Sequence, residues 1–105
     1  MEDRRVFTRI ETRLPLRFKD LNQSKEGTAE TINISANGLG LVTNGNLTIK
    51  TSIEMWLYIP DHHEPLHTRG EVIWSADLEG TKYKRIGVRL EKEELMGLAR
   101  ALWVK

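Results

Sequence analysis

Alternation of apolar and polar residues is the sequence feature that most limits the fold of this chain. In residues 14–18 and 53–59, every second side chain is apolar. A period of two is typical of β-strands that bury one face and expose the other. We therefore expect a β protein whose core takes alternate positions from these strands, namely Leu14, Leu16, Phe18, Ile53, Met55, Leu57 and Ile59.

Turn residues divide the chain into further segments with strand composition. Asn37-Gly38 is a strong tight-turn signal and predicts a hairpin, and Pro60 ends the strand that begins near Ile53. Pro15 suits an edge strand, where a missing N–H is tolerated. Six short antiparallel strands at this spacing predict a mainly β, barrel-like fold, with strands over residues 14–18, 28–34, 39–43, 53–59, 66–75 and 83–90.

From Glu91 onward the apolar period changes from two to about three and a half, which predicts a C-terminal amphipathic α-helix. Its apolar stripe should cover an open end or face of the barrel, because so short a helix is marginal alone. We expect one domain, organised as a flexible basic arm over residues 1–10 and a barrel with its helix over residues 11–105. The stripe consists of Leu95, Leu98, Ala99, Leu102 and Trp103.

Composition excludes several classes of protein. No apolar run is long enough to cross a bilayer, and the charged N-terminus is not followed by a signal-peptide core. The chain has no cysteine, so disulfides and thiolate metal sites are excluded. The net charge of +1 lacks the strongly basic character of a nucleic-acid coat protein. A cytoplasmic globular domain is the default expectation.

Positive charge is concentrated at the N-terminus, where five of the nine arginines fall within residues 1–17. Arginines recur there every four residues, as on a basic helix, but Pro15 and the alternation around it argue against a helix. Solvated surface charge is one interpretation of these residues. The sharper interpretation concerns Arg4, Arg5 and Arg9, which precede the first strand and are free to close over a ligand.

A second motif runs from Asn33 to Gly38 and has the form Asn-x-Ser-x-x-Gly, with Ser35 at its centre. It has a structural interpretation as a hairpin corner in which Gly38 takes a positive φ. Combined with the upstream Arg-xxx-Arg pair, it supplies guanidinium forks for phosphate and a polar, close-approach turn for a nucleobase edge. The two motifs together indicate a small anionic ligand that carries a purine.

With these two motifs in this order, the chain resembles a PilZ domain, the bacterial receptor module for cyclic di-GMP. The resemblance rests on Arg5-Val6-Phe7-Thr8-Arg9 and Asn33-Ile34-Ser35-Ala36-Asn37-Gly38, and extends to Gly70-Glu71-Val72-Ile73-Trp74 and Ile86-Gly87-Val88-Arg89-Leu90. It covers nearly the whole chain. It implies a six-stranded antiparallel β-barrel with a C-terminal α-helix.

The resemblance also assigns roles to residues. Arg5 and Arg9 would bind phosphates and guanine faces, Asn33 and Ser35 would bond guanine and backbone groups, and Gly38 would allow close approach. Asn33 stands where aspartate is commoner, so its bond should be weaker by about 1 kcal/mol than a charge-assisted one. Arg4 would serve a second, intercalated copy of the ligand. Trp74 would border the site and stack on a base, or lie in the core or at the rim.

The resemblance implies a receptor that signals to an effector protein, in motility, secretion or polysaccharide synthesis, by ordering its N-terminal arm. We expect no further cofactor, no membrane span, and a monomer or homodimer. Two alternatives stay open. One is a PilZ-type adaptor that binds only protein, through Trp56 or Trp103, and the other is a barrel that binds single-stranded nucleic acid. The nucleic-acid contacts would then be the basic arm and Trp56, Tyr58 or Tyr83.

Enzyme chemistry has little support in the sequence. The serines lack the context of a nucleophile elbow, and the carboxylates lack a partnered base. His62, His63 and His67 have the residue type of a zinc site, but Pro65 beside them favours an exposed turn. We expect neither a catalytic group nor a metal site.

Overall fold

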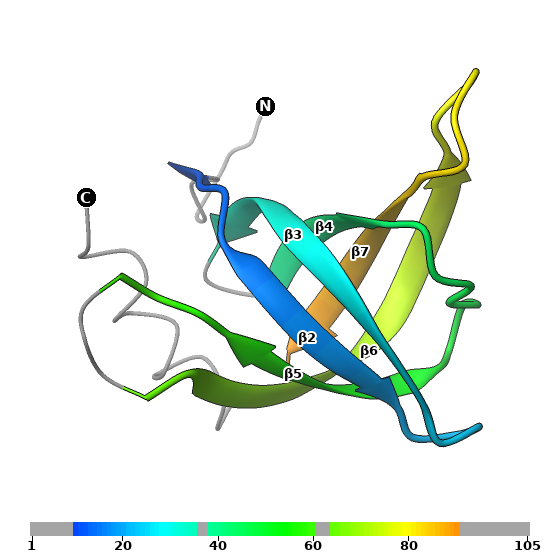
Figure 1. The fold of residues 1–105 in the computed structure, drawn as a ribbon. Coiled ribbons are helices and arrows are strands. Elements are labelled where there is room, and N and C mark those ends of the chain that lie inside the picture. Colours follow the sequence, from blue (N-terminus) through cyan, green and yellow to red (C-terminus); the bar gives the residue numbers. More distant parts are fainter. Residues whose placement is uncertain (1–9, 36–37, 61–63, 91–105) are drawn as a thin grey trace, which may run out of the picture.

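The structure is a computed structural model that describes residues 10–35, 38–60 and 64–90. This part of the chain forms a closed antiparallel barrel of six strands, β2 to β7, with a two-residue strand β1 added beside β3 (Figure 1). The strands are β1 Ile10–Glu11, β2 Pro15–Asp20, β3 Lys25–Ser35, β4 Gly38–Thr43, β5 Ser52–Leu57, β6 Leu66–Asp77 and β7 Lys84–Leu90. The expectation of a mainly β, six-stranded antiparallel barrel is confirmed. The predicted helix after Glu91 lies outside the described residues.

Around the barrel the strands follow the order β3-β2-β5-β6-β7-β4, and β4 returns to β3 to close it. Strand β3 is long enough to serve three partners. One edge pairs with β2 over residues 25–30 and with β1 at Asn33 and Ile34, while the other edge pairs with β4 from Glu30 to Ser35. The start of the described chain therefore lies beside the end of β3.

The expectation that residues 14–18 form an edge strand is wrong, because β2 lies between β3 and β5 and pairs with both. Pro15 is compatible with this central place because it is the first residue of the strand. Its carbonyl oxygen still accepts a hydrogen bond from the Tyr58 amide at 3.0 Å.

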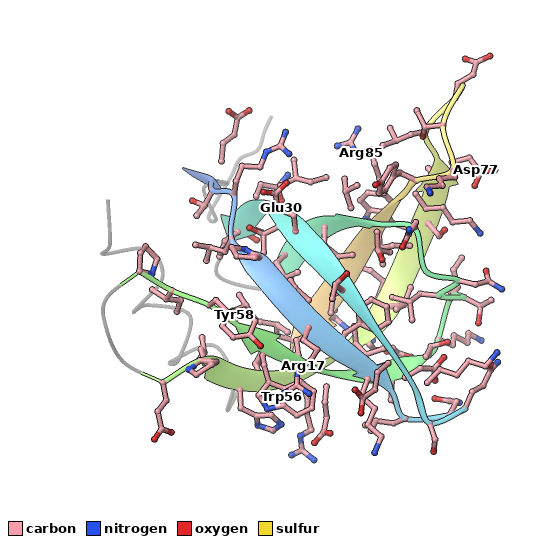
Figure 2. All side chains as sticks on the ribbon, viewed as in Figure 1. Arg17, Glu30, Trp56, Tyr58, Asp77 and Arg85 are labelled. Atoms are coloured by element: carbon pink, nitrogen blue, oxygen red, sulfur yellow. The ribbon has the colours of Figure 1, made fainter. Side chains whose placement is uncertain are left out.

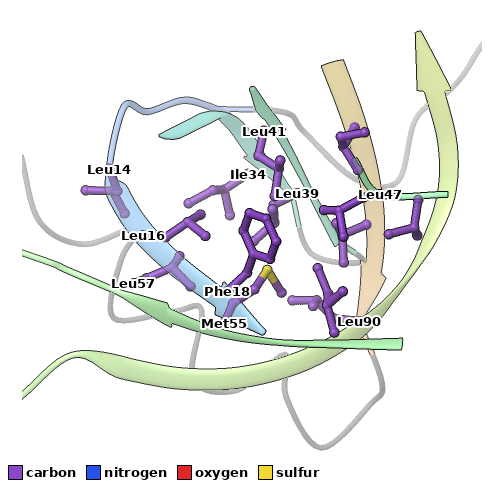
Figure 3. Packing of buried hydrophobic residues seen from close by; sticks show 14 of the residues in the cluster. Leu14, Leu16, Phe18, Ile34, Leu39, Leu41, Leu47, Met55, Leu57 and Leu90 are labelled. Carbon is purple, nitrogen blue, oxygen red and sulfur yellow. The ribbon is translucent and has the colours of Figure 1, made fainter. Parts of the chain in front are cut away.

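Apolar side chains from all six barrel strands fill the interior (Figure 3). The alternation seen in the sequence determines which side chains point inward, since successive residues of a strand face opposite sides. All seven residues expected in the core from the alternation are buried. The cluster consists of Leu14, Leu16, Phe18, Ile34, Leu39, Leu41, Leu47, Ile53, Met55, Leu57, Ile59, Val72, Ile86, Val88 and Leu90.

A buried threonine joins β1 to β2 where the two strands meet along β3. The Leu14 amide donates to Thr31 Oγ1 at 2.8 Å, and the Thr31 hydroxyl donates to the Thr12 carbonyl oxygen. Thr12 also donates its amide to the Ile32 carbonyl at 3.1 Å, so the break between β1 and β2 leaves few backbone groups without a partner. This hydroxyl helps to hold the N-terminal segment against β3.

Two buried threonines should respond differently to the same substitution. Thr31→Val removes a hydroxyl that serves two backbone groups, so we expect a loss of about 1–3 kcal/mol of unfolding free energy. Thr68 Oγ1 is buried with no hydrogen-bond partner among the described residues, so Thr68→Val should be neutral or stabilise by about 1 kcal/mol. Urea unfolding of both variants measures the difference. Equal losses in the two would contradict this assignment.

Candidate functional site

The second sequence motif begins in a row of residues that crosses four strands of the barrel wall. Asn33 on β3 is paired with Gly40 on β4, Gly40 with Gly87 on β7, and Gly87 with Trp74 on β6. Residues directly opposite one another in antiparallel strands face the same side of the sheet. Ile34, the neighbour of Asn33, is in the core, so this row faces outward.

The two glycines in the middle of the row form a floor that its end residues cover. A Cβ on Gly40 would lie 3.1 Å from Asn33 Oδ1, and a Cβ on Gly87 would collide with the indole ring of Trp74. The side chains of Asn33 and Trp74 therefore lean over the glycines from opposite ends. Because glycine has no side chain, the polar amide of Asn33 and the flat ring of Trp74 lie close against the backbone of the barrel wall.

A second row runs beside the first and contains the rest of the described motif. Ser35 is paired with Gly38, Gly38 with Arg89 on β7, and Arg89 with Glu71 on β6. The Ser35 hydroxyl is buried and donates to the Gly38 carbonyl oxygen at 3.4 Å. The two rows together bring residues from β3, β4, β6 and β7 onto one outer patch.

The reason for glycine at position 38 differs from the hairpin-corner interpretation. Among the described glycines only Gly80 has a positive φ. Gly38 is required by space, because a Cβ there would collide with the Val88 carbonyl oxygen of the neighbouring strand β7. The glycine lets β4 and β7 approach closely under the motif.

The two rows enclose a pocket of about 100 Å³ on the outer face of the barrel. A bulge in β6 at Ile73 shifts the register between Val72 and Trp74, so that Ile73 and Trp74 are both partly exposed at its edge. The lining residues include Ser35, Gly38, Gly40, Trp74, Gly87 and Arg89. A larger hollow of about 480 Å³ adjoins it and shares Arg89, and none of the four described candidates Asn33, Ser35, Gly38 and Trp74 lines it.

Electrostatically, the described pocket is marked by one ion pair. An Arg89 guanidinium nitrogen lies 2.7 Å from Glu71 Oε1, with 63% of the arginine side chain and 39% of the glutamate side chain exposed. An exposed pair of this kind stabilises the fold by less than about 1 kcal/mol. The pair therefore adds little to the stability of the barrel, and the charged group at the pocket itself is the Arg89 guanidinium.

The structure brings together Asn33, Ser35, Gly38 and Trp74, four of the seven residues that the sequence nominated. Arg4, Arg5 and Arg9 lie outside the described residues, which begin at Ile10. Ile10 is paired with Ile34, between Asn33 and Ser35.

Sequence reasoning missed Gly40, Gly87 and Arg89 as members of the pocket. Two signals could have found them. Gly38 and Gly40 are two residues apart and so share one strand face, and Gly87 and Arg89 belong to the late-strand segment that carried part of the family resemblance.

The other predicted candidates lie elsewhere. Arg17 lies over the ring of Trp56, with its guanidinium carbon 4.4 Å from the ring centroid. Both side chains are on the outer side of β2 and β5, at a distance from Arg85 on β7 (Figure 2). His67 Nε2 is 3.2 Å from Glu54 Oε2, whereas His62 and His63 lie outside the described residues. Within residues 10–35, 38–60 and 64–90, no three potential metal ligands come together.

The geometry defines a class of protein, a small antiparallel β-barrel with a glycine-floored polar pocket on its outer wall. A family model described as PilZ domain matches residues 3–102. The chain belongs to the PilZ domain family. Within its described part, no helix is long and apolar enough to traverse a bilayer.

Solved structures of similar fold include the Bacillus subtilis Inhibitor of motility (MotI/DgrA), with a TM-score of 0.73 and 16% identity over 96% of this chain and 51% of that one. The PilZ domain of Escherichia coli YcgR with c-di-GMP gives a TM-score of 0.71 and 14% identity over 93% and 88% of the two chains. The K. pneumonia MrkH–c-di-GMP complex gives 0.70 and 14% over 96% and 51%.

This chain thus spans about half the length of two of these three proteins, and the low identities support the shared fold alone. No curated protein matches the sequence.

The contact between Trp74 and Gly87 can be tested by a double-mutant cycle. Gly87→Ala should destabilise the barrel by about 1–3 kcal/mol, because the new methyl group collides with the indole. In a Trp74→Ala background this loss should largely disappear, since the obstacle is a side chain. Gly38→Ala is the control, because its obstacle is the Val88 backbone and its loss should persist in both backgrounds. Chemical unfolding of the variants measures the coupling.

Proposed function

We propose that this protein is a cyclic di-GMP receptor that binds the dinucleotide between its Arg5-xxx-Arg9 segment and the outer-wall pocket. The observation that carries the proposal is the pairing of Ile10 with Ile34. Arg9 is bonded directly to Ile10, and Arg5 is five residues from it. Since an extended chain spans about 3.5 Å per residue, Arg5 is within about 18 Å of Ile10, which is paired with the strand that carries Asn33 and Ser35.

The size of the pocket supports a site completed by a further segment. Small-molecule sites usually measure about 300–1,000 Å³, whereas the described pocket has about 100 Å³. Its lining includes Gly40, Gly87, Ser35 and the flat indole of Trp74, and Asn33 lies beside it against Gly40. This combination of flat and polar groups suits a purine ring. Phosphates need cationic forks, and the arginines of residues 1–9 have this chemistry.

The comparisons support the same ligand. The YcgR PilZ domain and MrkH, which share this fold, are both described as structures with c-di-GMP. In this proposal Arg5 and Arg9 bind phosphates and guanine faces, and Asn33 accepts a hydrogen bond from a guanine N–H. Arg4 adds a third guanidinium for a second, intercalated copy of the ligand, and Trp74 stacks on a base.

Signalling follows from the position of the arginines on the segment before β1. Two phosphates neutralise several arginines of residues 1–10 and hold that segment against the barrel wall. The barrel surface is thereby changed, and an effector protein in the cytoplasm, of a motility, secretion or polysaccharide-synthesis system, reads the change. The protein acts as an adaptor and catalyses no reaction.

Calorimetry with cyclic di-GMP tests the ligand and its arginines. The parent protein should bind with two nucleotides per chain, and Arg5→Ala and Arg9→Ala should each weaken binding at least tenfold, since each removes charge-assisted hydrogen bonds. Arg17→Ala is the matched control, because Arg17 continues the same four-residue spacing but lies over Trp56. It should bind as the parent does.

Cyclic di-AMP and a short oligonucleotide complete the titration. If the parent binds the oligonucleotide and all three variants, Arg5→Ala, Arg9→Ala and Arg17→Ala, lose that binding, the nucleic-acid alternative is supported and the proposal is overturned. Absence of any nucleotide binding would favour the adaptor that binds only protein. Saturation at one cyclic di-GMP per chain would overturn the intercalated dimer alone.

Hydrogen exchange tests the proposed signal. Saturating cyclic di-GMP should slow amide exchange in residues 1–10, because the ligand holds this segment in place. Strand β5 (Ser52–Leu57) is the internal control, since none of its residues lines the pocket, and its exchange should not change. Unchanged exchange in residues 1–10 at full occupancy would contradict the signalling step.

A further inference from the structure

The late-strand segment Ile86-Gly87-Val88-Arg89-Leu90 contributes more to the pocket than its floor. Gly87 and Arg89 face outward on β7, since Val88 between them is in the core. Gly87 lies under Trp74, and Arg89 is the register partner of Gly38. An arginine with a mostly exposed side chain thus lies directly beside the glycine of the second motif.

The guanidinium of Arg89 is at present engaged by an anion on its other side. Glu71 on β6 lies 2.7 Å away, and this carboxylate lines the larger adjoining hollow but not the 100 Å³ pocket. Arg89 lines both. Its side chain therefore lies at the boundary between the two hollows, with Glu71 on the β6 side of Arg89 and Gly38 on the β4 side.

We propose that Arg89 is a phosphate ligand of the pocket and that it exchanges the Glu71 carboxylate for a ligand phosphate on binding. This inference rests on the proposed function, because it assigns a further residue to the same site. Carboxylate and phosphate oxygens accept the same paired hydrogen bonds from a guanidinium, so one anion can replace the other. Little is lost in the exchange, because the pair is exposed and weak.

The position of Arg89 also separates it from Arg85, the other arginine on this face of β7. Arg85 is opposite Val42 on β4 and Ala76 on β6, and it does not line the pocket. Both are exposed arginines on the same face of the same strand. Arg85 therefore serves as a control for the general effect of positive charge near the site.

The test is calorimetry with cyclic di-GMP on the full chain. Arg89→Ala should weaken binding about tenfold, and Arg89→Lys, which keeps the charge but loses the fork, should weaken it less. Glu71→Gln should tighten binding about two- to threefold, because it removes the competing carboxylate. The double variant should bind as Arg89→Ala does. Arg85→Ala should stay within twofold of the parent, and unfolding temperatures check that every variant is folded.

The outcomes separate this inference from the proposed function. Binding by the parent that is lost in Arg5→Ala but unchanged in Arg89→Ala would overturn the role of Arg89 and leave the receptor intact. Equal weakening by Arg85→Ala and Arg89→Ala would replace a specific contact with general electrostatics. Weaker binding by Glu71→Gln would overturn the anion exchange. No binding by the parent would overturn the receptor itself.

Discussion

The closure of the barrel at β3 is the constraint on which the rest of the structure depends. This strand pairs with β1 and β2 along one edge and with β4 along the other, so it joins the start of the described chain to β4 and closes the barrel. Closure leaves each barrel strand one inward and one outward face, and the interior holds the apolar cluster with a few buried polar side chains such as Thr31 and Thr68. Asn33 and Ser35 consequently lie on the outer side of β3, beside β1 and the start of β4.

The outer patch depends on glycines that do nothing for the core. Gly38, Gly40 and Gly87 contribute no side-chain packing, and a glycine in a strand interior weakens the strand. The barrel tolerates them because its stability comes from the opposite face of the same strands. Their absence of side chains lets β4 and β7 approach and lets Asn33 and Trp74 cover the backbone. The barrel thus has an outer wall on which the strands approach closely, and this is the surface that the proposed ligand would contact.

The sequence predicted the strands and the core well, because a period of two is a local property that each segment shows by itself. It was wrong about the position of β2 in the sheet, because the residues of a strand do not show which other strands pair with it. One of its two interpretations gave Gly38 a turn conformation, whereas the decisive neighbour is Val88, fifty residues further along the chain. The motif residues of the pocket were recognisable by type and spacing, but Gly87 and Arg89 gained their meaning only from the strands beside them.

By itself, then, the sequence determined which side chains face inward, where the turns fall and which functional groups the chain contains. Alternation, turn residues and functional groups are all properties of short segments of the chain. The tertiary structure alone decided which of these groups are neighbours. Asn33 meets Gly40, Gly87 meets Trp74, and Arg89 lies between Gly38 and Glu71 because barrel closure and the bulge at Ile73 set the register between distant strands. Register arises from the packing of all strands together, and no single segment contains it.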